Sequence, residues 1–186
     1  MASARNVLSL FALSLIAVVV AACATKTQVE SDLGISGAPE WVNEGTNTLN
    51  NRDGRLFHGV GQAPAMGDEA LQISTADSRA RAEVARIFSS YLDVVGHDYL
   101  SATGAGKDAD AQQSVSQQIH NLTKVNLAGA RIIAHWRHEK TQTIYSLAEL
   151  DMNQVKQTAA AADNMNEDLR RYLSTQGDNI FDRMGQ

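Results

Sequence analysis

The stretch that decides the fold is Ile73–Val95, ISTADSRARAEVARIFSSYLDVV, where apolar residues return every three or four positions. This spacing places them on one side of an α-helix, the side that packs on a core. Asp68 stands just before the pattern, where its carboxylate can cap the first turn. We therefore expect a long amphipathic helix that starts after Asp68 and is stopped or weakened near Gly96. The residues of the buried side are Ile73, Ala76, Ala80, Val84, Ile87, Tyr91 and Val95.

A second side of the same predicted helix is charged. Arg79, Glu83 and Arg86 follow one another at spacings of four and three, which places them close together on the helix surface. Opposite charges at these spacings support a helix weakly, and they are also available to another protein. We take these three residues as a candidate interface.

Strands are predicted on both sides of this helix in the sequence. Arg55–Ala63 (RLFHGVGQA) is a short strand candidate, ended by Pro64 and Gly67. Further on, 125–137 and 143–150 are joined by the polar turn His138–Gln142, which predicts a hairpin. The apolar residues of 125–137 change parity, and a bulge near Ala128–Gly129 would put both sets on one face. We expect Trp136 to fill the core at the end of this hairpin.

Two further helices complete the predicted domain. A weaker one covers 111–122, and a last one starts at Asp151 or Asn153 and is interrupted near Gly177. The fold class is thus α+β: a small antiparallel sheet, one strand plus a hairpin, packed against a long helix and a C-terminal helix. We expect one domain over 39–175 and a C-terminal tail over 176–186.

The N-terminus has the pattern of a secretory signal. One basic residue, Arg5, precedes an apolar run over 7–22 that is short for a membrane-spanning helix. The run ends in Val20-Ala21-Ala22-Cys23, which looks like the lipobox of bacterial lipoproteins. The alternative is an ordinary signal peptide, or a poor membrane anchor, with an incidental cysteine.

Cys23 is the only cysteine in the chain, and it stands where lipid attachment needs a thiol. We expect cleavage between Ala22 and Cys23, which removes 1–22 as a lipoprotein signal peptide. Cys23 would then carry diacylglycerol and an N-acyl chain, and 23–38 would form a flexible tether. By resemblance to the usual sorting rule, Ala24 directs the protein to the outer membrane, with the domain facing the periplasm.

Composition excludes several other classes of protein. A net charge of -5 argues against nucleic acid as a partner, because phosphate binding needs an excess of Lys and Arg. A single cysteine excludes an internal disulfide and a multi-cysteine zinc site. Gly59-Val60-Gly61 resembles the start of a dinucleotide-binding loop, but Pro64 removes an amide that such a loop needs. We interpret these glycines as sites of close packing under the helix.

Histidines offer one weak metal motif, His135-x-x-His138. Residues three apart on a strand point to opposite faces, so this pair makes a poor chelate. No nucleophile elbow occurs, and lipid would occupy the only thiol. We therefore expect no enzymatic activity, no metal and no cofactor other than the lipid on Cys23.

Five short segments resemble the Lpp-twenty family of small bacterial outer-membrane lipoproteins, which includes relatives of the flagellar lipoprotein FlgP. They are Pro39–Val42 (PEWV), Gly59–Ala63 (GVGQA), Ala80–Ala85 (ARAEVA), Arg131–Trp136 (RIIAHW) and Tyr145–Leu150 (YSLAEL). The likeness covers about 39–151 and the lipobox. It implies a non-enzymatic lipoprotein, with rings or discs beneath the outer membrane as the assembly of some relatives.

The expected function is therefore structural: the domain binds itself or a periplasmic or flagellar protein, anchored to the outer membrane. Trp41 is the other candidate contact, either as an exposed interface anchor or as a residue that pins the tether to the domain. Two alternatives stay open. One is an adaptor or activator of a periplasmic cell-wall enzyme, and the other is a small-molecule binder with a pocket between sheet and helices.

Overall fold

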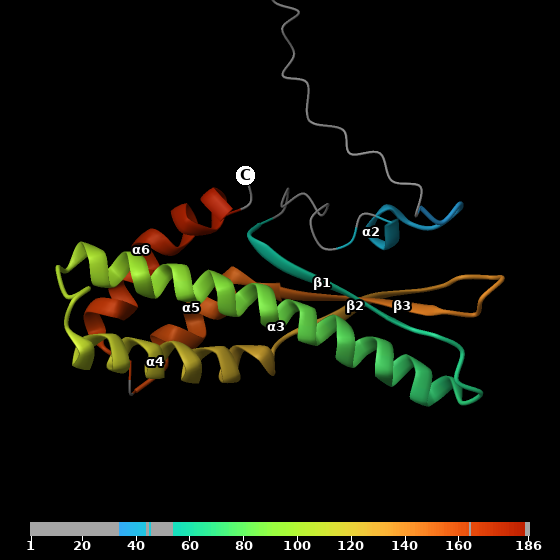
Figure 1. Cartoon of the computed structure of the whole chain (residues 1–186), viewed down its shortest axis with the longest axis horizontal. Helices are drawn as coiled ribbons and strands as arrows, with labels where there is room; N and C mark the ends of the chain where they lie inside the picture. Colours follow the sequence, from blue (N-terminus) through green and yellow to red (C-terminus); the bar gives the residue numbers. More distant parts are fainter. Residues whose placement is uncertain (1–33, 44, 46–53, 164, 185–186) are drawn as a thin grey trace, which may run out of the picture. The chain divides into compact units, whose positions relative to one another are not determined.

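The computed structural model describes residues 34–43, 45, 54–163 and 165–184, and Ile35 onward forms one compact unit. Its described part is an α+β fold, with five helices and a three-stranded antiparallel sheet (Figure 1). The elements are α2 Glu40–Asn43, β1 Leu56–Ala63, α3 Glu69–Ala102, α4 Ala109–Leu127, β2 Arg131–Arg137, β3 Ile144–Asp151, α5 Met152–Ala160 and α6 Glu167–Met184. The predicted fold class is confirmed.

The sheet has the strand order β1-β3-β2, so the returning strand of the hairpin is central. Leu56 lies opposite Asp151 at one end of the β1–β3 pair, and Ala63 lies opposite Ile144 at the other. The bulge in β2 is at Ile133, between Ile132 and Ala134. The predicted bulge near Ala128–Gly129 is therefore wrong in position.

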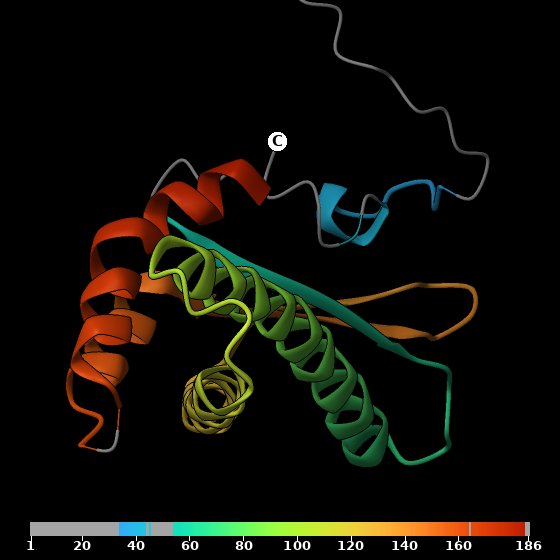
Figure 2. The same cartoon turned by 60° about the vertical axis from the view of Figure 1, so that its left-hand side comes forward.

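Helix α3 crosses one face of the sheet at very short range (Figure 2). A Cβ atom at Gly61 would lie 2.8 Å from the carbonyl carbon of Arg79, and one at Gly59 would lie 2.6 Å from the amide nitrogen of Val84. Only glycine leaves room for a helix backbone at that distance. The interpretation of the glycine pair as a close-packing site is confirmed.

The long helix itself follows the sequence pattern. Asp68 caps it, since its carboxylate accepts a hydrogen bond of 3.0 Å from the amide of Leu71. The helix continues through Gly96, where a stop or a weak point was expected, and ends at Ala102. A Cβ atom at Gly96 would collide with the side chain of Ile119, so this glycine lets α3 and α4 approach each other.

An aromatic cluster forms the centre of the core. The ring of Phe57 lies 5.3 Å from those of Phe88 and Tyr91 and 5.0 Å from that of Phe181, all in edge-to-face geometry. The Tyr91 hydroxyl faces Gly177 of α6 and has no hydrogen-bond partner among the described residues. Burial raises the pKa of Tyr91 far above its usual range.

Part of the predicted strand 125–137 is helix instead. Helix α4 continues to Leu127, and β2 begins only at Arg131. Val125 is 61% exposed on that helix. Its apolar side chain therefore marks neither a strand nor a position in the core. Three apolar residues of α4 are buried, namely Val115, Ile119 and Leu122.

The C-terminal region differs most from the prediction. The single expected helix is two, α5 and α6, and α6 runs through Gly177 to Met184. Ile180 and Phe181 are buried, so the expected tail over 176–186 is, as far as Met184, helical and part of the domain. The predicted domain end at 175 is therefore wrong. Of the two predicted start residues, Asp151 is the one that caps α5, accepting from the amide of Asn153 at 2.8 Å.

Candidate functional site

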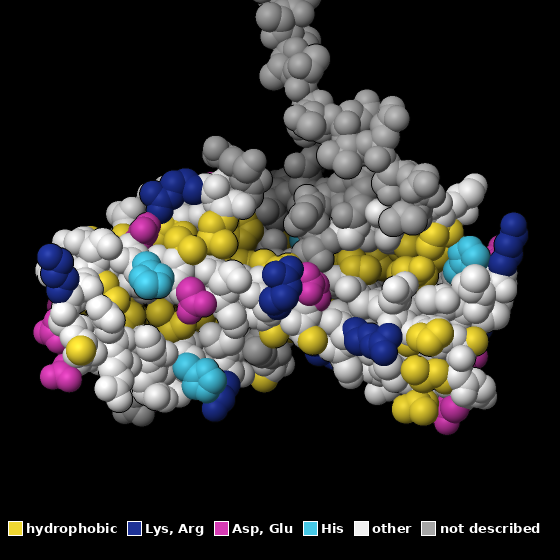
Figure 3. Space-filling view, viewed as in Figure 1, with side chains coloured by type: hydrophobic (Ala, Val, Ile, Leu, Met, Phe, Trp, Pro, Cys, Tyr) yellow, Lys and Arg dark blue, Asp and Glu magenta, His cyan; other side chains and the backbone are white. Residues whose placement is uncertain are grey.

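Residues Arg79, Glu83 and Arg86 lie along α3, with both arginines exposed and Glu83 half-buried. Arg79 Nη1 donates to the carbonyl of Gln62 at 2.6 Å, at the outer edge of β1. Arg86 Nη2 lies 2.6 Å from Glu83 Oε1, and this hydrogen-bonded pairing lowers the pKa of Glu83. Figure 3 shows basic and acidic side chains interspersed on the face that carries α3. A partner at this surface would meet charges of both signs.

Neither tryptophan is fully buried. Trp41 is half-buried on the short helix α2. The Asn43 side chain accepts from the amide of Ile35 and donates to its carbonyl, which joins the end of α2 to the segment before it. Trp136 is half-buried on β2, with its ring 5.5 Å from that of Tyr145 and 5.8 Å from that of His138. The prediction that Trp136 fills the core is therefore wrong. Trp136 lies opposite Tyr145 of β3, and it belongs to β2, which is an edge strand of the sheet. Ala134, two positions before Trp136 on the same strand, has only a small side chain.

The two motif histidines have separate partners. His135 Nε2 lies 2.7 Å from Asp77 Oδ1, whereas His138 Nδ1 accepts from the amide of Thr141 at 3.0 Å. Within the described ranges no three His, Cys, Asp or Glu side chains gather as a metal site would require.

Asp77 links a histidine and a serine, the residue types of a hydrolytic triad. Ser146 Oγ donates to Asp77 Oδ1 at 2.7 Å, the same oxygen that contacts His135. The carboxylate therefore lies between the other two groups, and the serine hydroxyl faces an acceptor that cannot serve as the triad's histidine base. Ser146 is completely buried. The arrangement connects α3 to β2 and β3.

A second polar group lies on the other sheet face. Glu149 Oε2 is 3.2 Å from His58 Nε2, and Glu149 Oε1 accepts from Arg131 at 3.1 Å. Desolvation of the buried His58 ring lowers its pKa, against the opposing effect of Glu149. This group ties β1 to β3 and β2.

Hollows lie between helices. One of about 300 Å³ between α3 and α4 is lined by polar side chains over an apolar floor that includes Gly96 and Ile119. A larger one of about 530 Å³ lies beside α4 and the end of α5, with Leu122, Val125 and Met165 in its lining. The small-molecule alternative placed its pocket between sheet and helices, and these hollows have a different location.

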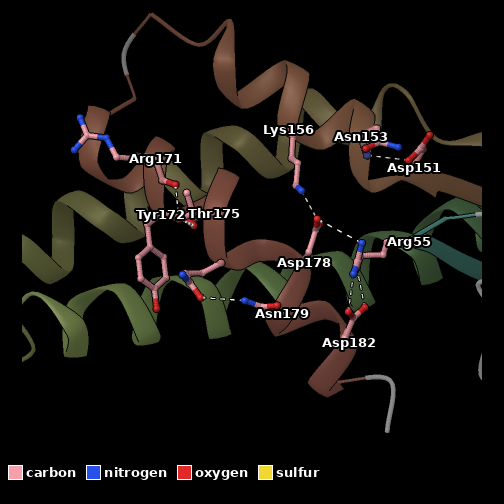
Figure 4. Close-up of polar contacts among 11 residues, drawn as sticks. Arg55, Asp151, Asn153, Lys156, Arg171, Tyr172, Thr175, Asp178, Asn179 and Asp182 are labelled. Atoms are coloured by element: carbon pink, nitrogen blue, oxygen red, sulfur yellow. Dashed lines mark hydrogen bonds and ion pairs between the residues drawn. The ribbon is translucent and has the colours of Figure 1, made fainter.

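Among the described residues, a four-residue charged cluster lies where the chain enters the sheet. Arg55, the residue before β1, meets two carboxylates of α6, Asp178 and Asp182, and Lys156 of α5 also pairs with Asp178 (Figure 4). Arg55 and Asp182 are 127 positions apart. This cluster is not predictable from the sequence, because no local pattern connects such distant residues. The spacing of four between Asp178 and Asp182 on a helix was its only signal.

Ala22 and Cys23 lie outside the described residues, so the lipobox stays a prediction from sequence. In the part of the chain that is described, no helix has the length and apolar character to cross a membrane. The chain matches no model of a protein family and no curated protein. The candidate sites therefore rest on the residues themselves.

Proposed function

We propose that this chain is an outer-membrane lipoprotein with a non-enzymatic, structural role, and that its domain assembles with copies of itself or with a periplasmic partner. The observation that carries the proposal is the single cysteine at the end of a signal-like apolar run, directly after Val20-Ala21-Ala22. The resemblance to the Lpp-twenty family supports the same conclusion and suggests a flagellum-associated ring or disc.

The mechanism of assembly would be effective concentration. Acyl chains on Cys23 would confine the domains to one membrane surface, where weak contacts between neighbours become effective. The described domain supports this with two available surfaces. One is the charged side of α3, and the other is β2, an edge strand whose residues are exposed at alternate positions. Repeated contacts of one kind between copies close into a ring when their geometry allows.

The anchor is tested by metabolic labelling with palmitate. We expect the wild-type chain to be labelled and Cys23→Ser to lose the label completely, because no other thiol is present in the sequence. Ala24→Asp is the matched control: it should keep the label but be retained at the inner membrane. Label that persists in Cys23→Ser would exclude the lipid anchor.

Assembly is tested by chemical crosslinking in cells. We expect a ladder of homo-oligomers from the wild type, and a weaker ladder from the charge reversals Arg79→Glu and Arg86→Glu. Arg171→Glu is the control, because Arg171 is exposed and its ion pairs to described residues are with Glu167 and Asp168 of its own helix. An adduct with a cell-wall synthase and no ladder would favour the adaptor alternative. Normal swimming of a deletion strain would contradict the flagellar version.

A further inference from the structure

Arg55 holds the C-terminal helix at the point where the N-terminal segment joins the sheet. Its Nε and Nη2 atoms donate to the two carboxylate oxygens of Asp182 at 2.8 and 2.6 Å, a bidentate geometry. Its Nη1 lies 3.4 Å from Asp178, and Lys156 Nζ lies 2.6 Å from the other oxygen of Asp178. Figure 4 shows these side chains converging from the residue before β1 and from α5 and α6. We call Arg55, Lys156, Asp178 and Asp182 the clasp.

The backbone at this position is also held. The carbonyl of Arg55 accepts a hydrogen bond of 2.9 Å from the amide of Met152, the first residue of α5. The next residue, Leu56, is the first member of the β1–β3 ladder, opposite Asp151. A pull that reaches Arg55 along the chain would therefore act on the clasp and on this end of the ladder.

The end of α6 that carries Asp182 is packed against the core and paired with α3. On α6, Phe181 neighbours Asp182 and packs its ring 5.0 Å from that of Phe57. Arg183 Nη2 lies 2.6 Å from Asp98 Oδ2 and ties the same end of α6 to α3. Force that reaches Asp182 is thus passed to the core and to the longest helix.

We propose that the clasp is a mechanical junction, which keeps β1 from being peeled off the sheet when the domain is pulled through its N-terminal segment. The inference rests on the proposed anchoring, because a domain that is anchored at Cys23 and bound to a partner is pulled along that segment. An antiparallel edge strand that is pulled from its end separates one residue pair at a time. The clasp adds several ionic contacts that must break together before the first pair opens.

The contribution of the clasp at equilibrium is modest. The Arg55 side chain is 37% exposed and that of Asp182 is 48% exposed, so water screens their attraction. We therefore expect Arg55→Ala to move the urea midpoint only slightly. Its effect on the unfolding rate under force should instead depend on the direction of pulling. The rate should rise strongly where the force passes through residue 55, and little where it does not.

Single-molecule pulling tests this on the purified chain from Cys23 onward, which contains the whole compact unit. Without lipid, Cys23 is one thiol handle, and Asn153→Cys, exposed at the start of α5 beside the Asp151 end of β3, provides the second, so that β1 and β3 are pulled apart from the same end. In this geometry Arg55→Ala and the milder Asp182→Asn should each unfold about tenfold faster than the parent at the same force. Arg171→Ala, which removes ion pairs within α6 alone, is the control and should leave the rate unchanged.

A second geometry separates a junction from general stabilisation. With Cys23→Ser, handles at Lys107→Cys and Lys140→Cys bypass residue 55, and there the clasp variants should unfold within about twofold of the parent. Equal acceleration in both geometries, or none in the first, would overturn the proposal. Because no lipid is present, this result is independent of the palmitate experiment, so a failure of the junction and a failure of the anchor are distinguishable.

Discussion

Gly61→Ala is expected to destabilise the domain by about 3 kcal/mol or more, a large effect for one methyl group. The new Cβ would lie 2.8 Å from the carbonyl carbon of Arg79 and still closer to the backbone of Ala76 and Ala80. Neither β1 nor α3 can yield cheaply, because the obstacle is helix backbone rather than a flexible side chain. Urea unfolding followed by circular dichroism measures the loss.

Gly106→Ala is the matched control for this substitution. A Cβ atom at Gly106 would have only the carbonyl of Leu100 nearby, at 3.8 Å, an ordinary contact. Its stability should therefore change by no more than about 0.5 kcal/mol. If both alanine variants unfold at the same urea concentration, then α3 and β1 are not packed backbone to backbone.

Phe57→Ala is expected to lower the free energy of unfolding by about 4 kcal/mol. Phe57 is 4% exposed, and its ring contacts those of Phe88, Tyr91 and Phe181. Its removal leaves a cavity among rigid rings that belong to α3 and α6, and loses three edge-to-face contacts. Thermal or urea unfolding of the purified domain gives the value.

The control for Phe57 is another large apolar residue, Leu71, which is 56% exposed on α3. Leu71→Ala removes a side chain of similar character from water rather than from the core, so we expect a change within about 0.5 kcal/mol. Comparable losses for the two variants would mean that the aromatic cluster is not the centre of the core.

The parts of the fold that the sequence predicts are those with strong local patterns. The 3.6-residue period identified α3, and glycines at alternate positions of β1 indicated close packing. The errors have local causes too. Val125 and Leu127 are apolar residues at the end of a helix, and a run that short does not distinguish helix from strand. Gly177 suggested a helix end, but it makes room for the Tyr91 hydroxyl instead.

The candidate sites were less predictable than the fold. The charged side of α3 follows from spacing, so Arg79, Glu83 and Arg86 could be placed together before their partners were known. The clasp could not be predicted, because it depends on how α6 returns to the start of β1. His135 also meets Asp77 only through the packing of α3 against β2. Such contacts are tertiary, and no sequence period encodes them.

The position of β3 at the centre of the sheet has a consequence for the order of folding. β1 is synthesised early, yet its partner strand begins only at Ile144, and the residues that hold Arg55 lie at 178 and 182. Contacts over such long separations close slowly, because a long loop must be ordered first. Neighbours in sequence such as α3 and α4 can pair while the chain is still emerging. The sheet therefore forms late, and the contacts of Arg55 form only after the part of α6 that contains Asp182 has been synthesised.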